Sequence, residues 1–235
     1  MKKSKITTLE FIDIIILSII FFGAPIYYSL AMFFETQYKG VSFDKLIFND
    51  LANYNALIQI LLSLFVAWIY LTFRKFDFNV LNFKINRRTL PTIFLLVCSA
   101  GLVADIYQYI HYIIFPEHYA NIYSGESYSP KYNLILLITC LANGFYEEIF
   151  FMGLVFATKP KYMPYAIGYS ILVRFIFHTY QGWAGALTIV TLGIVFLFFR
   201  KKISSLVPFF IAHAIFDIFG LGLLGIIYSV GLNIS

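Results

Sequence analysis

The sequence predicts an all-α fold: a polytopic transmembrane helix bundle of about seven helices, with room for an eighth. Of its 235 residues, 60% are hydrophobic and only 12% are charged, and the mean hydropathy is +0.81. Soluble domains carry roughly 25% charged and 45–50% apolar residues. The apolar residues also gather in long runs, each near the ~20 residues that a spanning helix needs. These observations predict an integral membrane protein.

Seven apolar runs define the expected helices. Pro25 lies inside the first run, where a proline is expected to kink a helix. An eighth, short helix fits either residues 43–53 or residues 81–89. The seven runs are 9–34, 57–73, 90–115, 133–157, 164–180, 184–199 and 206–230.

The basic residues predict the orientation of these helices. Of the 17 Lys and Arg residues, thirteen fall in the N-terminus and in the second, fourth and sixth connections. The other connections hold only Lys39, Lys45 and Lys131, and Arg174 lies inside the fifth run. Cytoplasmic loops carry the excess of positive charge, so we expect a cytoplasmic N-terminus and an external C-terminus. The thirteen are Lys2, Lys3, Lys5, Arg74, Lys75, Lys84, Arg87, Arg88, Lys159, Lys161, Arg200, Lys201 and Lys202.

Composition and charge also argue against a nucleic-acid-binding protein and against a disulfide-rich fold. The net charge of +5 is explained by topology, so it does not indicate a nucleic-acid partner; the lipid bilayer is the expected surroundings. Cys98 and Cys140 both lie within apolar runs, so no disulfide framework is expected. No small-residue cleavage site follows the first run, which we interpret as a retained signal anchor.

Two adjacent carboxylates, Glu147 and Glu148, lie within the fourth apolar run. An acidic residue at mid-membrane costs about 2.5–3.5 kcal/mol on insertion scales, so a pair indicates a function. Successive helical residues point about 100° apart, so one carboxylate should face a polar centre and the other a neighbouring partner.

Other ionisable residues fall at a similar depth. At ~1.5 Å per residue, Glu147 lies about 18 Å from Lys159, His213 about 16 Å from Lys202, and His178 about 21 Å from Pro164. Asp217 follows His213 by one helical turn. Three helices thus bring titratable groups to one level, which predicts a shared site.

These groups support more than one chemistry. A carboxylate in a low-dielectric site can take a proton from water as a general base, and a histidine can share that water or stabilise an oxyanion. Water could then attack a peptide carbonyl without a serine or cysteine nucleophile. Two histidines and a carboxylate also match a catalytic zinc site, although the compact His-Glu-x-x-His motif is absent. A small transporter is a further alternative, and the lack of an internal repeat counts against it.

The order of these motifs resembles a known family. Glu147-Glu148, then His178 in the run from Arg174 to Gly182, then His213-x-x-x-Asp217 is similar to the CPBP intramembrane proteases. This group includes the type II CAAX prenyl endopeptidases and the bacteriocin-processing or Abi proteins. The resemblance covers about residues 133–223, so we divide the chain into variable N-terminal transmembrane helices (1–132) and a catalytic helical core (133–235).

The resemblance implies roles for individual residues. Glu147 would be the water-activating base, with His178 as its partner. His213 would stabilise the oxyanion or act as a second base, with Asp217 orienting it. Apart from the resemblance, the position of Asn143 one turn before Glu147 suggests that it orients that carboxylate or binds the scissile carbonyl. No cofactor is firmly implied, and a divalent metal such as zinc stays an alternative.

Two positions depart from the family pattern. The arginine expected five residues after Glu147 is Met152, and the phenylalanine expected four residues before His178 is Arg174. Glu148 thereby loses its local partner, which would make its charge costly. Our hypothesis is that Arg174, the one basic residue without a topological role, supplies the missing charge from the next helix.

The sequence therefore predicts an intramembrane endopeptidase of a bacterial cell membrane, acting on a peptide or a membrane-anchored protein. The alternative is a non-proteolytic homologue that acts as a bacteriocin-immunity or regulatory membrane partner.

Overall fold

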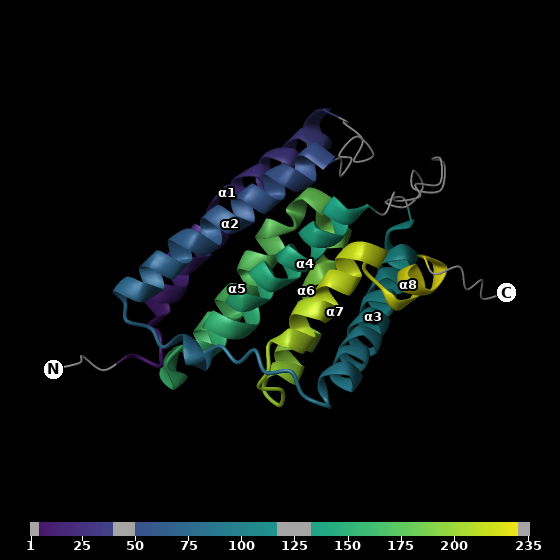
Figure 1. Ribbon diagram of the computed structural model, residues 1–235. Coiled ribbons are helices and arrows are strands. Elements are labelled where there is room, and N and C mark those ends of the chain that lie inside the picture. Colours follow the sequence, from purple (N-terminus) through teal and green to yellow (C-terminus); the bar gives the residue numbers. More distant parts are fainter. Residues whose placement is uncertain (1–4, 40–49, 117–132, 230–235) are drawn as a thin grey trace.

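The computed structural model describes residues 5–39, 50–116 and 133–229, and this part of the chain folds as a helical bundle (Figure 1). The all-α prediction is confirmed: the described residues contain eight α-helices, and their only β-pairing is two isolated bridges. The helices are α1 (Phe11–Lys39), α2 (Asp50–Phe73), α3 (Thr89–Ile114), α4 (Leu134–Glu148), α5 (Met163–Phe177), α6 (Gly182–Arg200), α7 (Val207–Phe219) and α8 (Leu223–Ser229).

Five segments are long and apolar enough to cross a membrane: Phe11–Thr36, Asp50–Phe73, Thr89–Ile114, Leu134–Ala157 and Thr179–Arg200. Helices α5 and α7 are shorter, at 15 and 13 residues. At 1.5 Å per residue α7 is about 20 Å long, less than the ~30 Å of the hydrocarbon core. Two of the predicted spans are therefore shorter than a full crossing.

Three details differ from the sequence expectations. The run 206–230 is not one helix, because the chain turns at Gly220, whose φ of +102° suits glycine, before α8 begins. Helix α1 contains Pro25 and ends at Lys39, five residues beyond the predicted end of the first run. Residues 81–89 form no extra helix; a single 3₁₀ turn, Phe78–Val80, precedes them. The other candidate, 43–53, lies mostly outside the described residues.

One end of the bundle, which we call the basic end, consists of the connections 5–10, 74–88, 158–162 and 201–206. Backbone hydrogen bonds join these connections: Ile6 N–H donates to Lys75 O (3.0 Å), Leu9 N–H to Ala157 O (2.8 Å), and Leu206 N–H to Asn82 O (2.8 Å). The described basic connections thus lie together, along the lower edge of the bundle in Figure 1.

Helix α4 is buried at its C-terminal end and packs closely against α7. Gly144 allows this contact, since a Cβ built there would lie 2.5 Å from the carbonyl oxygen of Phe210. Two residues further on, the ring of Tyr146 stacks on Phe21 of α1 (centroids 5.2 Å apart), and its hydroxyl donates a hydrogen bond to the Phe21 carbonyl. Helix α4 is therefore held from both sides, just where its two glutamates occur.

We predict that Gly144→Ala lowers the free energy of unfolding by about 1–3 kcal/mol, because overpacking forces α4 and α7 apart. Gly168→Ala on α5 is the matched control, since nothing lies within 4 Å of the added Cβ. Thermal unfolding in detergent measures both. Equal melting temperatures for the two variants would contradict the close approach of α4 and α7.

Candidate active site

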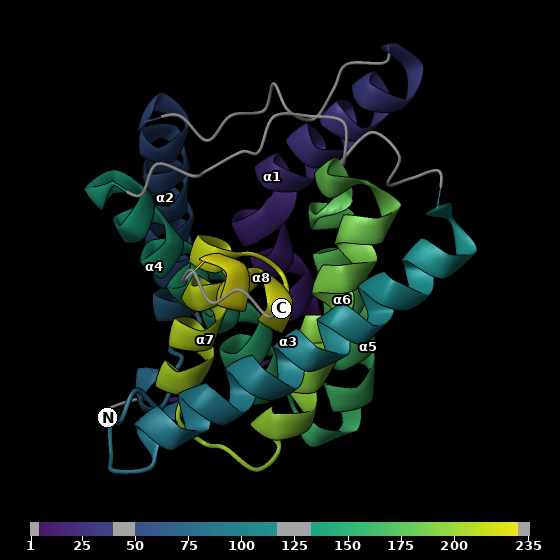
Figure 2. The same cartoon turned by 90° about the vertical axis from the view of Figure 1, so that its right-hand side faces the viewer.

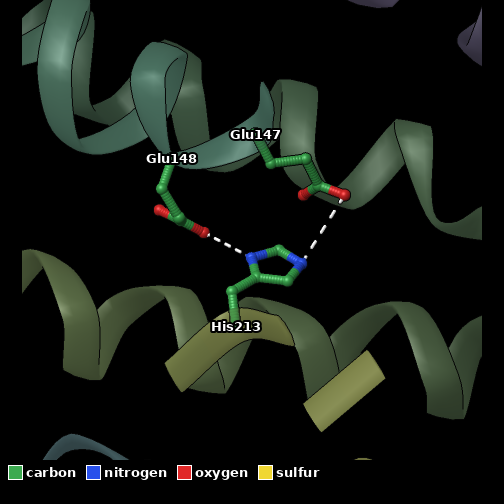
Figure 3. A group of neighbouring side chains, drawn as sticks. All are labelled: Glu147, Glu148 and His213. Carbon is green, nitrogen blue, oxygen red and sulfur yellow. Dashed lines mark hydrogen bonds and ion pairs between the residues drawn. The ribbon is translucent and has the colours of Figure 1, made fainter. Parts of the chain in front are cut away.

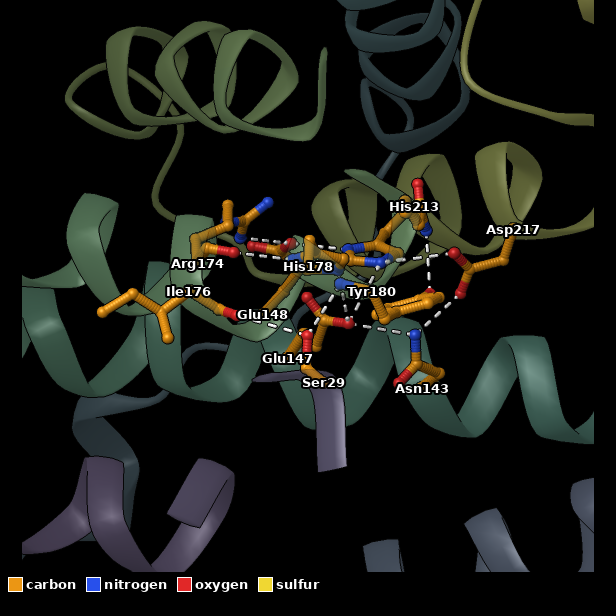
Figure 4. Close-up of polar contacts among 11 residues, drawn as sticks. Ser29, Asn143, Glu147, Glu148, Arg174, Ile176, His178, Tyr180, His213 and Asp217 are labelled. Carbon is orange, nitrogen blue, oxygen red and sulfur yellow. Dashed lines mark hydrogen bonds and ion pairs between the residues drawn. The ribbon is translucent and has the colours of Figure 1, made fainter. Parts of the chain in front are cut away.

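The predicted residues meet where three helices end or approach one another (Figure 4). Glu147 and Glu148 are the last two residues of α4, directly before a π-helical turn, Ile149–Leu154. His178 directly follows α5, and His213 lies within α7. The four side chains are buried, and none of these residues is more than 8% exposed.

Glu148 is the electrostatic partner of Arg174. Its Oε1 accepts hydrogen bonds from Arg174 Nη2 (2.8 Å) and from His213 Nδ1 (2.6 Å). The guanidinium also lies over the Phe151 ring, 4.1 Å from its centroid. Gly193 on α6 leaves room for it, because a Cβ there would lie 2.8 Å from Arg174 Cδ. A buried ion pair thus joins α4 to α5, and His213 extends it to α7.

Glu147 faces both histidines. Its Oε1 lies 3.8 Å from His178 Nε2 and 3.7 Å from His213 Nε2, and it accepts a hydrogen bond from Asn143 Nδ2 (3.1 Å). Figure 3 shows the His213 ring between the two glutamates. The other oxygen of Glu147, Oε2, is buried and has no hydrogen-bond partner within the described chain. Both separations from the histidine nitrogens exceed hydrogen-bond distance, so neither histidine satisfies the Glu147 carboxylate.

The two histidines have different environments. Nδ1 of His178 lies 2.8 Å from the carbonyl oxygen of Arg174, which can only accept, so Nδ1 carries the proton and Nε2 keeps a lone pair towards Glu147. Both nitrogens of His213 instead face carboxylates: Nδ1 faces Glu148, and Nε2 lies 3.5 Å from Asp217 Oδ1. His178 is thus placed as an acceptor and His213 as a donor.

The residues that could hold a metal overlap with this site. Glu147, Glu148 and His213 can each offer a ligand atom, and these atoms lie within 4.8 Å of one another. However, Glu148 Oε1 already accepts from a cationic guanidinium. By residue type, Glu147 with Nε2 of His178 and His213 is a second candidate set, because two histidines and one carboxylate are the donors of catalytic zinc. A metal held there would polarise the scissile carbonyl and acidify water.

The remaining sequence candidates are also located. Asn143 Nδ2 donates to Asp217 Oδ2 (2.9 Å), so both border the site. Asp105, an acidic residue of α3, lies outside the site: its carboxylate accepts from the first backbone amides of α8. Sequence reasoning missed Ser29 on α1, whose Oγ accepts from Tyr180 N–H (2.9 Å) and holds the turn after His178. A single serine in an apolar helix gives no signal of that contact.

A comparison with protein-family models matches residues 129–219 to the type II CAAX prenyl endopeptidase Rce1-like family. No curated protein and no solved structure matches the chain. The matched segment contains α4 to α7, and with them every residue of the site described above except Ser29.

We predict that Arg174→Met destabilises the protein by about 3–5 kcal/mol, because it leaves the Glu148 charge buried without its partner. Adding Glu148→Gln should recover most of that loss, and a double-mutant cycle from unfolding in detergent measures the coupling. Met152→Arg is a second rescue, since Met152 and Arg174 line the same small cavity. Additive effects in the cycle would contradict the ion pair.

Proposed function

We propose that this chain, whose residues 129–219 match the type II CAAX prenyl endopeptidase Rce1-like family, is an intramembrane endopeptidase. It would hydrolyse a peptide bond with a water activated by Glu147 and His178. One observation carries the proposal: Glu147 Oε1 is buried within 3.8 Å of Nε2 of both histidines. The substrate is a peptide or a membrane-anchored protein.

The acceptor atoms orient the nucleophile. A water between Glu147 Oε1 and His178 Nε2 donates one hydrogen to each, since both atoms are acceptors. Its free lone pair then points at the scissile carbonyl carbon. As the new C–O bond forms, the carboxylate of Glu147 takes the proton and acts as general base.

The donor atoms stabilise the product of that attack. His213 Nε2 lies 3.7 Å from Glu147 Oε1, where its N–H would stabilise the negative charge that develops on the carbonyl oxygen. The amide of Asn143 instead positions Glu147, because it donates to Oε1. When the C–N bond breaks, Glu147 returns its proton to the leaving amine. Glu148 and Asp217 hold the His213 ring in position through its two nitrogens.

The first test is Glu147→Gln, which keeps the size of the side chain but removes the base. We predict a loss of about 10²–10⁴-fold in kcat/KM for peptide cleavage in proteoliposomes, the usual range for a general base. The control is Gly168→Ala, which lies away from the site.

Cleavage in the presence of a chelator distinguishes a glutamate-activated water from a metal-activated one. Unchanged wild-type cleavage in chelator supports the metal-independent glutamate mechanism, whereas loss that zinc restores makes the histidines ligands. If wild type and a folded Glu147→Gln variant behave alike, the enzyme proposal is wrong and the regulatory-partner alternative replaces it.

Asp217 gives a further prediction through its contact with His213. Asp217→Asn keeps an oxygen that can accept from the ring, and losing one hydrogen bond costs about 1 kcal/mol, so kcat/KM should stay within about tenfold of wild type. Asp217→Leu removes both oxygens and should lower it further. Equal activities of the two variants would show that Asp217 does not position His213.

A further inference from the structure

Burial along α4 differs on the two sides of the glutamates. Every residue from 146 to 155 is buried, so this segment has no open face. On the other side of the pair, Leu134, Leu137, Ile138 and Leu141 are exposed. The α4 surface therefore offers no exposed path along which a peptide could reach the site from the basic end.

The side chains between the site and the basic end fill that half of the bundle. Phe150, Phe151, Leu154 and Phe209 are at most 1% exposed, and they pack in one hydrophobic core. The connections beyond them are joined by the backbone hydrogen bonds of the basic end. A peptide could enter from this side only by unpacking the core.

The accessible polar residues lie on the opposite side. Asn143, one turn before Glu147, is half-buried, as is Tyr180, two residues after His178. Asp217, one turn after His213, is exposed. Helix α4 runs towards the basic end, while α5 and α7 run away from it, so each of these three residues lies farther from the basic end than its catalytic neighbour.

The helix lengths place this opening below the surface of the bilayer. Helix α7 is about 20 Å long from its start near the basic end, so its outer end lies within the ~30 Å hydrocarbon core. Figure 2 shows α1 and α2 extending beyond α7 and α8 at the end away from the basic end. An extended peptide reaching in from that side would meet Asp217 and Asn143 before Glu147.

We propose that the site takes its substrate from the extracytoplasmic side: a peptide, or the membrane-proximal segment of an exported protein, that enters past Asp217. This inference rests on the proposed protease function and adds the side of entry. The basic end defines the cytoplasmic face through the excess of Lys and Arg in its connections. The exposed apolar residues Leu137 and Ile138 on α4 favour an apolar substrate segment.

Cysteine labelling tests the orientation without any activity. Trp183 is 52% exposed near the start of α6, and Lys201 is exposed just after its end. In a background with Cys98→Ser and Cys140→Ser, a membrane-impermeant maleimide should label Trp183→Cys in intact bacteria. It should label Lys201→Cys only after permeabilisation. The reverse pattern overturns the proposal.

Cleavage in oriented vesicles tests the side of entry. The probe is a charged, impermeant fluorogenic peptide, chosen from a mixed-sequence library because the detergent-solubilised protein cleaves it and Glu147→Gln does not. Right-side-out vesicles should cleave the added peptide, and inverted vesicles should do so only after detergent. Cleavage by intact inverted vesicles overturns the inference alone. If the folded protein cleaves no library peptide even in detergent, the protease function fails, and the inference with it.

Discussion

The buried ion pair between Glu148 and Arg174 is the contact on which the site depends. A lone carboxylate at this depth would be costly, and the 2.8 Å contact with the guanidinium offsets its charge. The same oxygen of Glu148 holds His213, so one atom connects α4, α5 and α7. That connection includes the 2.6 Å contact by which Glu148, together with Asp217, keeps the His213 ring facing Glu147.

The different contacts of the two glutamates follow from helical geometry. Because successive residues point in different directions, Glu148 turns towards Arg174 while Glu147 faces the histidines. One carboxylate is thereby neutralised by Arg174, whereas the other lies against the histidines. Oε2 of each glutamate is buried and has no hydrogen-bond partner in the described chain. Glu148 can then stabilise the structure while the adjacent Glu147 serves the proposed chemistry.

The sequence was sufficient to predict the all-α bundle and the residues that gather in the site. Hydropathy predicts the helices, because few other backbone structures can span a membrane. The census of basic residues also identified Arg174 as the partner of Glu148, since no loop accounted for its charge. Met152 stands where the family pattern has an arginine. Arg174, which supplies the charge here, lies close to that position, because Met152 and Arg174 line one cavity.

Other features could not be predicted from sequence, for physical reasons. Apolar runs report burial or lipid contact but not where a helix breaks, so the turn at Gly220 was hidden within an apolar run. The contact of Ser29 with Tyr180 joins residues 151 positions apart, and no local pattern encodes it. The π-helical turn after Glu148 depends on packing around α4 rather than on helix propensity.

Hydrolysis inside a bilayer needs both a dry environment for the base and a route for water. The closely packed core beside the basic end supplies the first, because it buries Glu147 against apolar side chains. The shortness of α7 supplies the second, since the exposed Asp217 lies one turn from His213 and brings polar groups to the edge of the site. A full-length helix in place of α7 would bury Asp217 and close that route. The break after Phe219 is therefore as important to the proposed chemistry as the glutamates themselves.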